Sequence, residues 1–272
     1  ALINEDKVTV LRDILPVLLE WLSRHEILLT KRDILSILLN LASDESRSIQ
    51  DLGLCAQLIR SLVSLPISQP DYIEGLDYIQ EVWAGDNGAQ SRVAVDYYLD
   101  VFDIIADALC PAVDRRKKLW SEFQGFLIEQ WPKLHEIQQL SAIELAEDLV
   151  GCSDQFPIMY AGREGVQVTP SINLAGKKLA IYSLTESAAR RAASVLVGKY
   201  PGLKVDLNHD KTATSALINL ADNSDYFVFS SRSAAHQAYY PVADRRKDLI
   251  YPSGKGFTSI VRAFVERIEL AA

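Results

Sequence analysis

The chain has 272 residues, of which 49% are hydrophobic, and its formal net charge at neutral pH is −8. That length and hydrophobic content suffice for one or two domains with buried cores. The three cysteines are too few and too scattered for a disulfide framework or a Cys-x-x-Cys zinc site, which indicates a reducing, cytoplasmic setting. Apolar runs stay well short of the ~20 residues that a membrane span needs, so we expect no membrane contact. The first residue is Ala1 rather than Met, and we expect the chain to be part of a longer protein.

Charge is distributed unevenly along the chain. Residues 1–150 hold 13 Lys and Arg against 25 Asp and Glu, whereas residues 151–272 hold 15 against 11. A surface that follows phosphate groups needs clustered cations, so the first part is not expected to bind nucleic acid. The second part is open to anionic ligands. Ordinary solvated helix faces are the alternative explanation of the acidic residues.

Apolar residues recur at helical spacing from Val8 to Val150. Capping-box patterns, in which a hydroxyl and a carboxylate satisfy the first backbone N–H groups of a helix, occur at Thr30 with Asp33 and at Ser141 with Glu144. Helices are predicted over 8–24, 31–42, 48–64, 71–83, 89–109, 113–131 and 141–150. Residues 1–150 are therefore predicted to form an all-α domain, either a helical bundle or a stack of helical pairs, and such stacks commonly bind protein partners.

Residues 151–176 lose the helical period and contain several Gly and Pro residues. This composition predicts a linker between domains. The apolar residues around Phe156 to Tyr160 are unusual for a free linker, and they could supply an edge strand or a hairpin.

Residues 177–272 alternate between short β-rich runs and helical runs. The β-rich runs are 179–183, 203–208, 226–230 and 249–251, and the helical runs are 186–200, 212–221, 234–244 and 257–270. Four such units, with strands that are largely apolar rather than alternating, indicate a parallel sheet covered by helices on both faces. Right-handed crossovers favour the strand order 2-1-3-4. The predicted fold class is thus a two-domain chain whose second domain is a small, doubly wound, Rossmann-like sheet.

Ligands of such sheets bind where the strand order reverses, at the carboxyl ends of the strands. Three loops reach that point, and their hydroxyls and helix N-termini are suited to hold an anion. The candidate ligand-binding residues are Ser183, Thr185 and Glu186 in the first loop, Ser230, Ser231, Arg232 and His236 in the second, and Ser253, Gly254, Lys255, Gly256 and Thr258 in the last. The alternative for the last loop is a tight turn whose Thr258 caps the following helix.

No catalytic residue and no metal ligand is assigned. The last loop is not a P-loop, because Lys255 precedes the second glycine, and the first β-α turn lacks the G-x-G-x-x-G of dinucleotide enzymes. A nucleophilic pairing of Ser230 or Ser231 with His236 is disfavoured, since the segment lacks the glycines of a nucleophile elbow. His209 and Asp210 are expected to form a turn. The cofactor is left unknown.

Three segments of the second domain carry a resemblance to a known family: KKLAIYSLTESAARRA, DYFVFSSRSAAHQA and LIYPSGKGFTSIVRAF. They resemble the Rossmannoid domain at the C-terminus of some large accessory proteins of bacterial anti-phage defence systems. The likeness extends from Lys177 to Leu270 and, more loosely, over 91–150. It implies a place in a multi-protein defence complex, and it transfers no catalytic residues.

The favoured hypothesis is a non-enzymatic sensor or assembly module of such a complex. Its helical domain would bind protein partners, and its Rossmannoid domain would bind a nucleotide, a phosphate or a nucleic-acid end. One alternative is an enzyme that processes a nucleotide or nucleic acid in the Rossmannoid cleft. The other is a purely structural scaffold for protein interactions.

Overall fold

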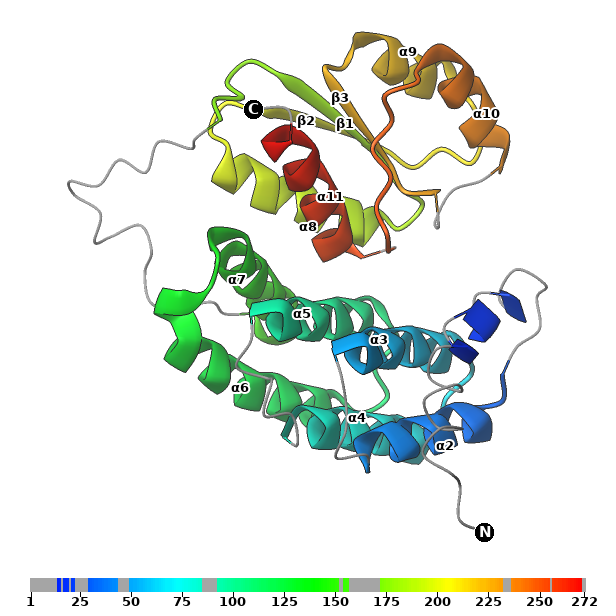
Figure 1. Cartoon of the computed structure of the whole chain (residues 1–272), viewed down its shortest axis with the longest axis vertical. Coiled ribbons are helices and arrows are strands. Elements are labelled where there is room, and N and C mark those ends of the chain that lie inside the picture. The colour runs from blue at the N-terminus through cyan, green and yellow to red at the C-terminus, as the bar shows by residue number, and fades with distance from the viewer. Residues whose placement is uncertain are drawn as a thin grey trace. The chain divides into compact units, whose positions relative to one another are not determined.

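The computed structural model describes residues 14–15, 17–19, 21–22, 29–43, 49–84, 92–151, 154–156, 172–231, 236–254 and 256–270. The chain divides into two compact units, residues 1–121 and 122–272, and each is described by itself. The first is helical, and the second combines helices with a small parallel sheet (Figure 1). Within the described ranges, no helix is long and apolar enough to cross a membrane.

The first unit is built from helices whose apolar faces pack together. They are α2 (Lys31–Ala42), α3 (Ile49–Ser64), α4 (Gln69–Ala84), α5 (Arg92–Asp107) and the first part of α6 (Val113–Gln130). Helix α3 packs against α5, and α2 packs against α3 and α4. In α6 the buried Trp120 meets Phe102 of α5 edge to face, with ring centroids 5.0 Å apart. The helical spacing of the sequence therefore predicted these elements correctly to within a few residues at each end.

One of the two predicted capping boxes is present. At the start of α2, Asp33 N–H donates to Thr30 Oγ1 at 3.2 Å, and Thr30 N–H donates to Asp33 Oδ2 at 3.1 Å. The box predicted at Ser141 is wrong, because α7 (Glu136–Val150) begins five residues earlier and Ser141 is buried within it. The backbone N–H of His135 donates instead to Gln138 Oε1 at 3.0 Å. Ser141 resembled a cap because its spacing to Glu144 is right, although Gln138 already caps the helix.

The sheet of the second unit contains three parallel strands in the order β2-β1-β3. They are β1 (Lys178–Tyr182), β2 (Lys204–Asn208) and β3 (Tyr226–Phe229), and the helices between and after them are α8 (Glu186–Lys199), α9 (Ser215–Asn223), α10 (His236–Arg245) and α11 (Phe257–Glu269). The predicted order of the first three strands is confirmed. The central strand is buried over most of its length, as its apolar sequence requires.

The predicted fourth strand is not confirmed, because residues 249–251 form only an isolated bridge to β3. Ile250 N–H donates to Phe227 O at 2.9 Å, and Ile250 O accepts from Phe229 N–H at 2.8 Å. The next donor that a parallel ladder needs would come from residue 252. That residue is proline, which has no backbone N–H, so the ladder ends after one residue.

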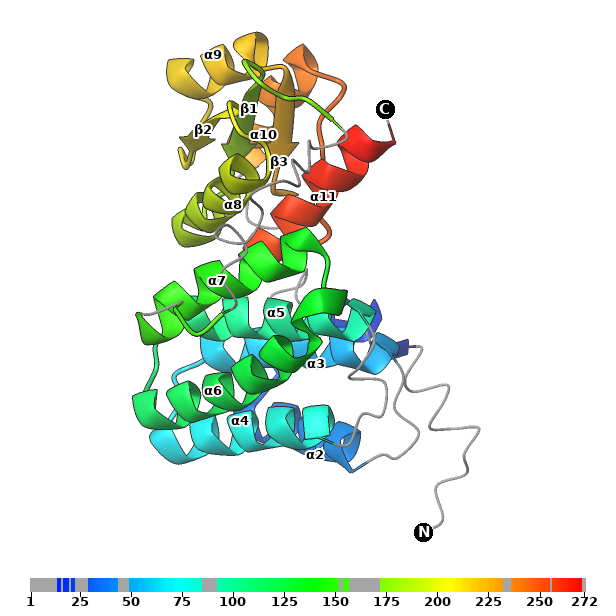
Figure 2. The same cartoon turned by 90° about the vertical axis from the view of Figure 1, so that its left-hand side faces the viewer.

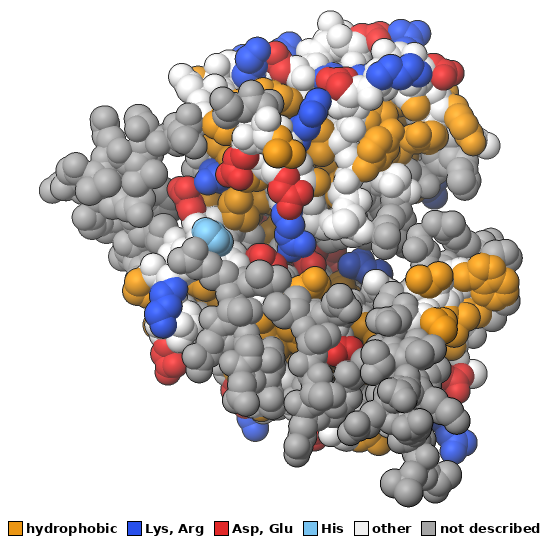
Figure 3. Space-filling view, in the orientation of Figure 1, with side chains coloured by type: hydrophobic (Ala, Val, Ile, Leu, Met, Phe, Trp, Pro, Cys, Tyr) orange, Lys and Arg blue, Asp and Glu red, His pale blue; other side chains and the backbone are white. Residues whose placement is uncertain are grey.

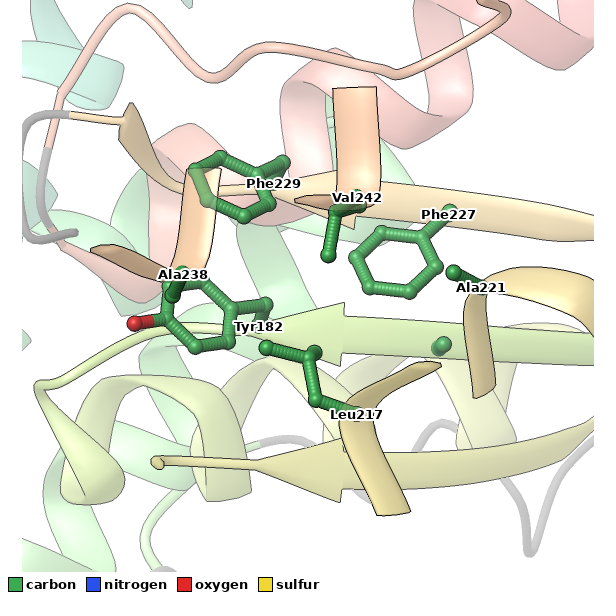
Figure 4. Packing of buried hydrophobic residues seen from close by; sticks show 8 residues of the cluster. Tyr182, Leu217, Ala221, Phe227, Phe229, Ala238 and Val242 are labelled. Carbon is green, nitrogen blue, oxygen red and sulfur yellow. The ribbon is translucent and has the colours of Figure 1, made fainter. Parts of the chain in front are cut away.

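The two faces of the sheet are covered by different helices (Figures 1 and 2). Figure 4 shows one side of the core, where Tyr182 of β1 stacks on Phe229 of β3 with centroids 4.6 Å apart. Helices α9 and α10 close this side. Because successive side chains of a strand point to opposite faces, the buried Leu179 and Ile181 face the other side, where α8 and α11 pack against each other. This is the doubly wound arrangement expected from the sequence.

Helix α7 packs against α8 through a row of polar contacts. They are Asp148 Oδ2 to Arg191 Nη1 at 2.6 Å, Glu144 Oε2 to Ser194 Oγ at 2.8 Å, and Glu136 Oε2 to Lys199 Nζ at 3.0 Å. The contacts pair decreasing residue numbers of α7 with increasing ones of α8, so the two helices run antiparallel. Helix α7 therefore belongs to the same compact unit as the sheet.

The predicted linker begins with an ordered contact. Phe156 is buried and stacks on Trp131, with ring centroids 4.7 Å apart. The strand that could follow falls mainly on residues 157–171, which lie outside the described residues. The domain limits 1–150, 151–176 and 177–272 stay a prediction, while the compact units divide the chain within α6.

The buried position of Arg191 yields a prediction about stability. The Arg191 side chain is only 2% exposed, so Asp148→Asn removes a carboxylate that compensates a charge inside the protein. We expect the free energy of unfolding to fall by about 2 kcal/mol, less than for a fully buried pair because the Asp148 side chain is partly exposed. Urea denaturation measures this change. The control is Asp222→Asn, which removes the exposed pair with Arg245 and should cost less than about 1 kcal/mol; equal losses would contradict the prediction.

Burial also raises the pKa of the Glu144 carboxyl above its usual value of 4.5, although the hydrogen bond from Ser194 opposes this. Ionised Glu144 is thus disfavoured in the folded protein. Because both folded and unfolded chains carry the protonated acid well below pH 4, the penalty is absent there and develops as the pH rises. Glu144→Gln should gain stability over the wild type between pH 4 and pH 7, measured by urea denaturation at several pH values. The prediction would be contradicted if the stability gained by Glu144→Gln over the wild type became smaller as the pH rises.

Candidate functional site

The carboxyl ends of the three strands meet at one edge of the sheet. Tyr182 of β1 is level with Asn208 of β2 and with Phe229 of β3. The pairing continues one residue further, since Ser183 N–H donates to Asn208 O at 3.2 Å and Ser230 N–H donates to Tyr182 O at 3.0 Å. The structure thus brings together the beginnings of the first two predicted loops.

Ser183 and Ser230 are fully buried at this edge. The Ser183 hydroxyl accepts a hydrogen bond from Thr185 N–H at 3.1 Å, which shapes the turn into α8. In this conformation the two serines hold the loops in place and do not present their side chains to solvent. Thr185 is half-buried, and Glu186 is exposed at the first position of α8.

The start of α8 already carries a negative charge. Thr185 makes no side-chain cap to the first turn, and Glu186 places a carboxylate where the positive end of the helix dipole lies. This carboxylate opposes the binding of a second anion there.

The start of α11 differs in that respect. Its N-cap is Gly256, which has no side chain that could cap the helix. Its first turn contains no acidic residue. Ser253 is exposed just before it, and Thr258 lies buried in its first turn. Of the described helix starts at this edge, the start of α11 is therefore better suited to an anion than the start of α8.

The last loop closes onto α11 through Ser259, which the sequence offered as a cap of this helix or as a phosphate contact. Ser259 Oγ accepts a hydrogen bond from Gly254 N–H at 2.6 Å and lies 3.2 Å from Ser253 Oγ. A Cβ at residue 254 would come within 3.1 Å of this oxygen, so glycine permits the close approach. The loop is thus held tightly on the helix. This agrees with the tight turn that was the alternative interpretation of the loop. The cap, however, is Gly256 and not Thr258.

Three of the predicted site residues lie wholly or partly outside the described residues. Arg232 and Lys255 lie outside the described residues, and His236 begins α10 with a side chain that is also outside them. Ser231 is exposed after β3.

A polar cluster at the end of β2 was missed by the sequence interpretation, which assigned His209 and Asp210 to a turn. Asp210 N–H does donate to Asn208 Oδ1 at 3.1 Å, as in a turn. The Asp210 carboxylate accepts hydrogen bonds from the hydroxyl of Thr214 and from the Asn208 amide, and these bonds hold its pKa below the usual range. The signal available in the sequence was the polar run Asn-His-Asp directly after a strand, with a threonine four residues later.

His209 is oriented by the adjacent strand end. Its Nδ1 lies 2.6 Å from the backbone oxygen of Ser183. A carbonyl oxygen only accepts hydrogen bonds, so Nδ1 carries the proton. In the neutral ring the lone pair that can accept a proton then lies on Nε2. Among the described residues no group of three or more His, Cys, Asp or Glu side chains could hold a metal ion.

The first unit contains a groove between α2 and α4 with a volume of about 330 Å³. Its lining residues are Lys31, Arg32, Leu35, Ser36, Leu39, Asp71, Glu74 and Tyr78. Lys31 pairs with Asp71 at 2.8 Å across it. Tyr78 donates a hydrogen bond to Glu74, which raises the pKa of Tyr78 to about 12. The groove combines an apolar floor with charged edges.

The Ser259 contact yields a test of the loop geometry. In Ser259→Ala the N–H of Gly254 loses its acceptor, and we expect the free energy of unfolding to fall by about 1 kcal/mol. Hydrogen exchange of the Gly254 amide should also become faster. Ser231→Ala, at an exposed position, is the control and should change stability by less than about 0.5 kcal/mol. Unchanged exchange at Gly254 would show that this bond does not hold the loop.

Comparison with known proteins adds one finding. A family profile described as DpdD-like matches residues 3–263, almost the whole chain. No curated protein and no solved structure matches significantly.

Proposed function

The chain belongs to the DpdD-like family, and we propose that it acts there as a non-enzymatic sensor or assembly module. The family is related to gene clusters for phage defence and DNA modification. In this proposal the sheet-containing part binds an anionic ligand, namely a nucleotide, a phosphate or a nucleic-acid end, and the helical part binds protein partners. The expected setting in a defence system agrees with the family match. The resemblance to a Rossmannoid domain of other defence proteins stays a prediction.

The start of α11 carries the proposal for the anionic ligand. It has glycine as its N-cap, no side-chain cap and no acidic residue in its first turn. Backbone N–H groups and the positive end of the helix dipole attract anions at such a position. The chain from residue 151 onward also has more basic than acidic residues, which favours the approach of an anion.

The acidic helical part supports the proposal of protein partners. Its α2–α4 groove offers Leu35 and Leu39 as apolar contacts, with charged side chains at the edges. A surface of this composition suits a peptide segment of a partner better than nucleic acid, because the surrounding helices carry excess negative charge.

An enzyme that acts on a nucleotide or on a nucleic-acid phosphodiester is the second candidate. The observation that favours it is His209, whose Nδ1 is held by Ser183 O so that Nε2 is left as a proton acceptor at the carboxyl edge. If this role is real, His209→Gln abolishes turnover of a nucleotide or oligonucleotide while ligand binding persists.

A charge placed beside α11 tests the anion proposal. Ser253→Asp introduces a carboxylate just before the helix, and we expect it to weaken the binding of inorganic pyrophosphate at least about tenfold by repulsion and competition. Thermal stabilisation by pyrophosphate measures the affinity, because a ligand of the folded state raises the melting temperature. Asn223→Asp adds the same charge at the end of α9, at the opposite edge of the sheet, and should leave binding unchanged. The proposal fails if the wild type shows no stabilisation, or if both variants bind equally well.

A further inference from the structure

A half-buried thiol and two buried hydrogen-bond donors come together around Tyr72 in the helical unit. Cys110 lies in the short loop between α5 and α6, and its thiol is free. Tyr72 of α4 is only 1% exposed. Arg116 lies near the start of α6, and its Nε is buried. The three side chains thus come from three neighbouring parts of the same unit.

The two donors have no good acceptor. Neither the Tyr72 hydroxyl nor Arg116 Nε makes a hydrogen bond of regular geometry to another described residue. Burial raises the pKa of Tyr72 above its usual range, and a weak hydrogen bond toward the Cys110 thiol raises it further. The charge of Arg116 acts in the opposite direction, so its guanidinium also lies near this hydroxyl. Arg116 Nη1 donates to Ile105 O at 3.0 Å, which holds the guanidinium against the end of α5.

The chemistry of sulfur suggests what would satisfy these donors. A thiol sulfur is a weak acceptor, and a buried donor without a proper acceptor costs free energy. An oxygen atom on the sulfur would be a much better acceptor for the Tyr72 hydroxyl and for Arg116 Nε. Cysteine gains such an oxygen when it reacts with a peroxide and forms a sulfenic acid.

The loop that carries Cys110 is open to solvent. Leu109, directly before it, is 89% exposed, and Pro111, directly after it, is also exposed. Hydrophobic side chains are exposed at several places on the molecule (Figure 3), so the exposure of Leu109 does not by itself mark a docking surface. Cys110 is half-buried, and a molecule as small as hydrogen peroxide can reach it.

We propose that Cys110 is a site of reversible oxidation by peroxides, with Tyr72 and Arg116 as the donors that hold the reacting oxygen. The thiol gives its proton to solvent, and the thiolate attacks one oxygen of the peroxide. The S–O bond forms as the O–O bond breaks, and the second oxygen leaves with the electron pair and takes up a proton. Sulfur is oxidised by two electrons, and hydrogen peroxide is reduced to water. A free thiol can afterwards reverse the oxidation.

This site lies in the helical unit, and it does not depend on the proposed anion site. Treatment of the full chain with hydrogen peroxide tests it, in the presence of dimedone, which labels sulfenic acids. Mass spectrometry of the digested chain gives the rate of labelling at each cysteine. We expect Cys110 to be labelled at least about ten times faster than Cys55, which is 4% exposed. Equal rates, or an unlabelled Cys110, would overturn the proposal.

Tyr72→Phe tests the role of the buried hydroxyl, because it removes one donor and keeps the ring. We expect the rate of labelling at Cys110 to fall about tenfold, the effect of one lost hydrogen bond to an oxygen that gains charge. The free energy of unfolding should not fall appreciably, since the hydroxyl has no regular partner, so a slower rate cannot result from unfolding.

Tyr97→Phe is the matched control, because Tyr97 is a half-buried tyrosine of α5 in the same unit. It should leave the rate of labelling at Cys110 unchanged. If Tyr72→Phe is folded and is labelled at Cys110 as fast as the wild type, Tyr72 does not hold the oxygen and the proposal is wrong. The same conclusion follows if both variants slow the labelling equally.

Discussion

The arrangement of the second unit depends on one buried charge. Arg191 of α8 pairs with Asp148 of α7 at 2.6 Å, and its guanidinium lies over the ring of Phe257, 5.4 Å from the centroid. Phe257 is the first residue of α11. A single side chain of α8 thus contacts two other helices, α7 and α11, and an arginine this deeply buried is stable only while its partners stay in place. The position of the α11 start, and with it the candidate anion site, is therefore linked to the packing of α7.

The same constraint explains why α7 belongs with the sheet although its sequence continues the helical pattern of the first part. Three acidic side chains of α7, Glu136, Glu144 and Asp148, each meet a basic or hydroxyl group of α8. Here paired charges and hydrogen bonds fix the register of two antiparallel helices, because a shift would leave Arg191 without Asp148.

At the carboxyl edge of the sheet the loops have different roles. The serines that follow β1 and β3 are buried and take part in backbone hydrogen bonds between the strand ends. The cluster around Asp210 caps α9 through Thr214. The loop before α11 is tied down by Ser259 and leaves the helix start without a side-chain cap. The edge thus combines a firm scaffold with one region whose groups are suited to a ligand.

Local sequence signals determined much of this fold. Helical spacing located α2 to α6, the pairing of Thr30 with Asp33 marked the start of α2, and short β-rich runs located β1, β2 and β3, because these features depend on residues near one another in the chain. Ser141 imitated a cap, and the run around Ile250 imitated a strand whose ladder Pro252 interrupts. Of the candidate site, the sequence located the edge and its loops, and it could not tell that Ser183 and Ser230 point inward. Only the tertiary structure decided that Arg191 of α8 contacts both α7 and α11 and that α7 belongs to the unit that contains the sheet, because such contacts join residues far apart in the sequence and depend on how whole elements pack.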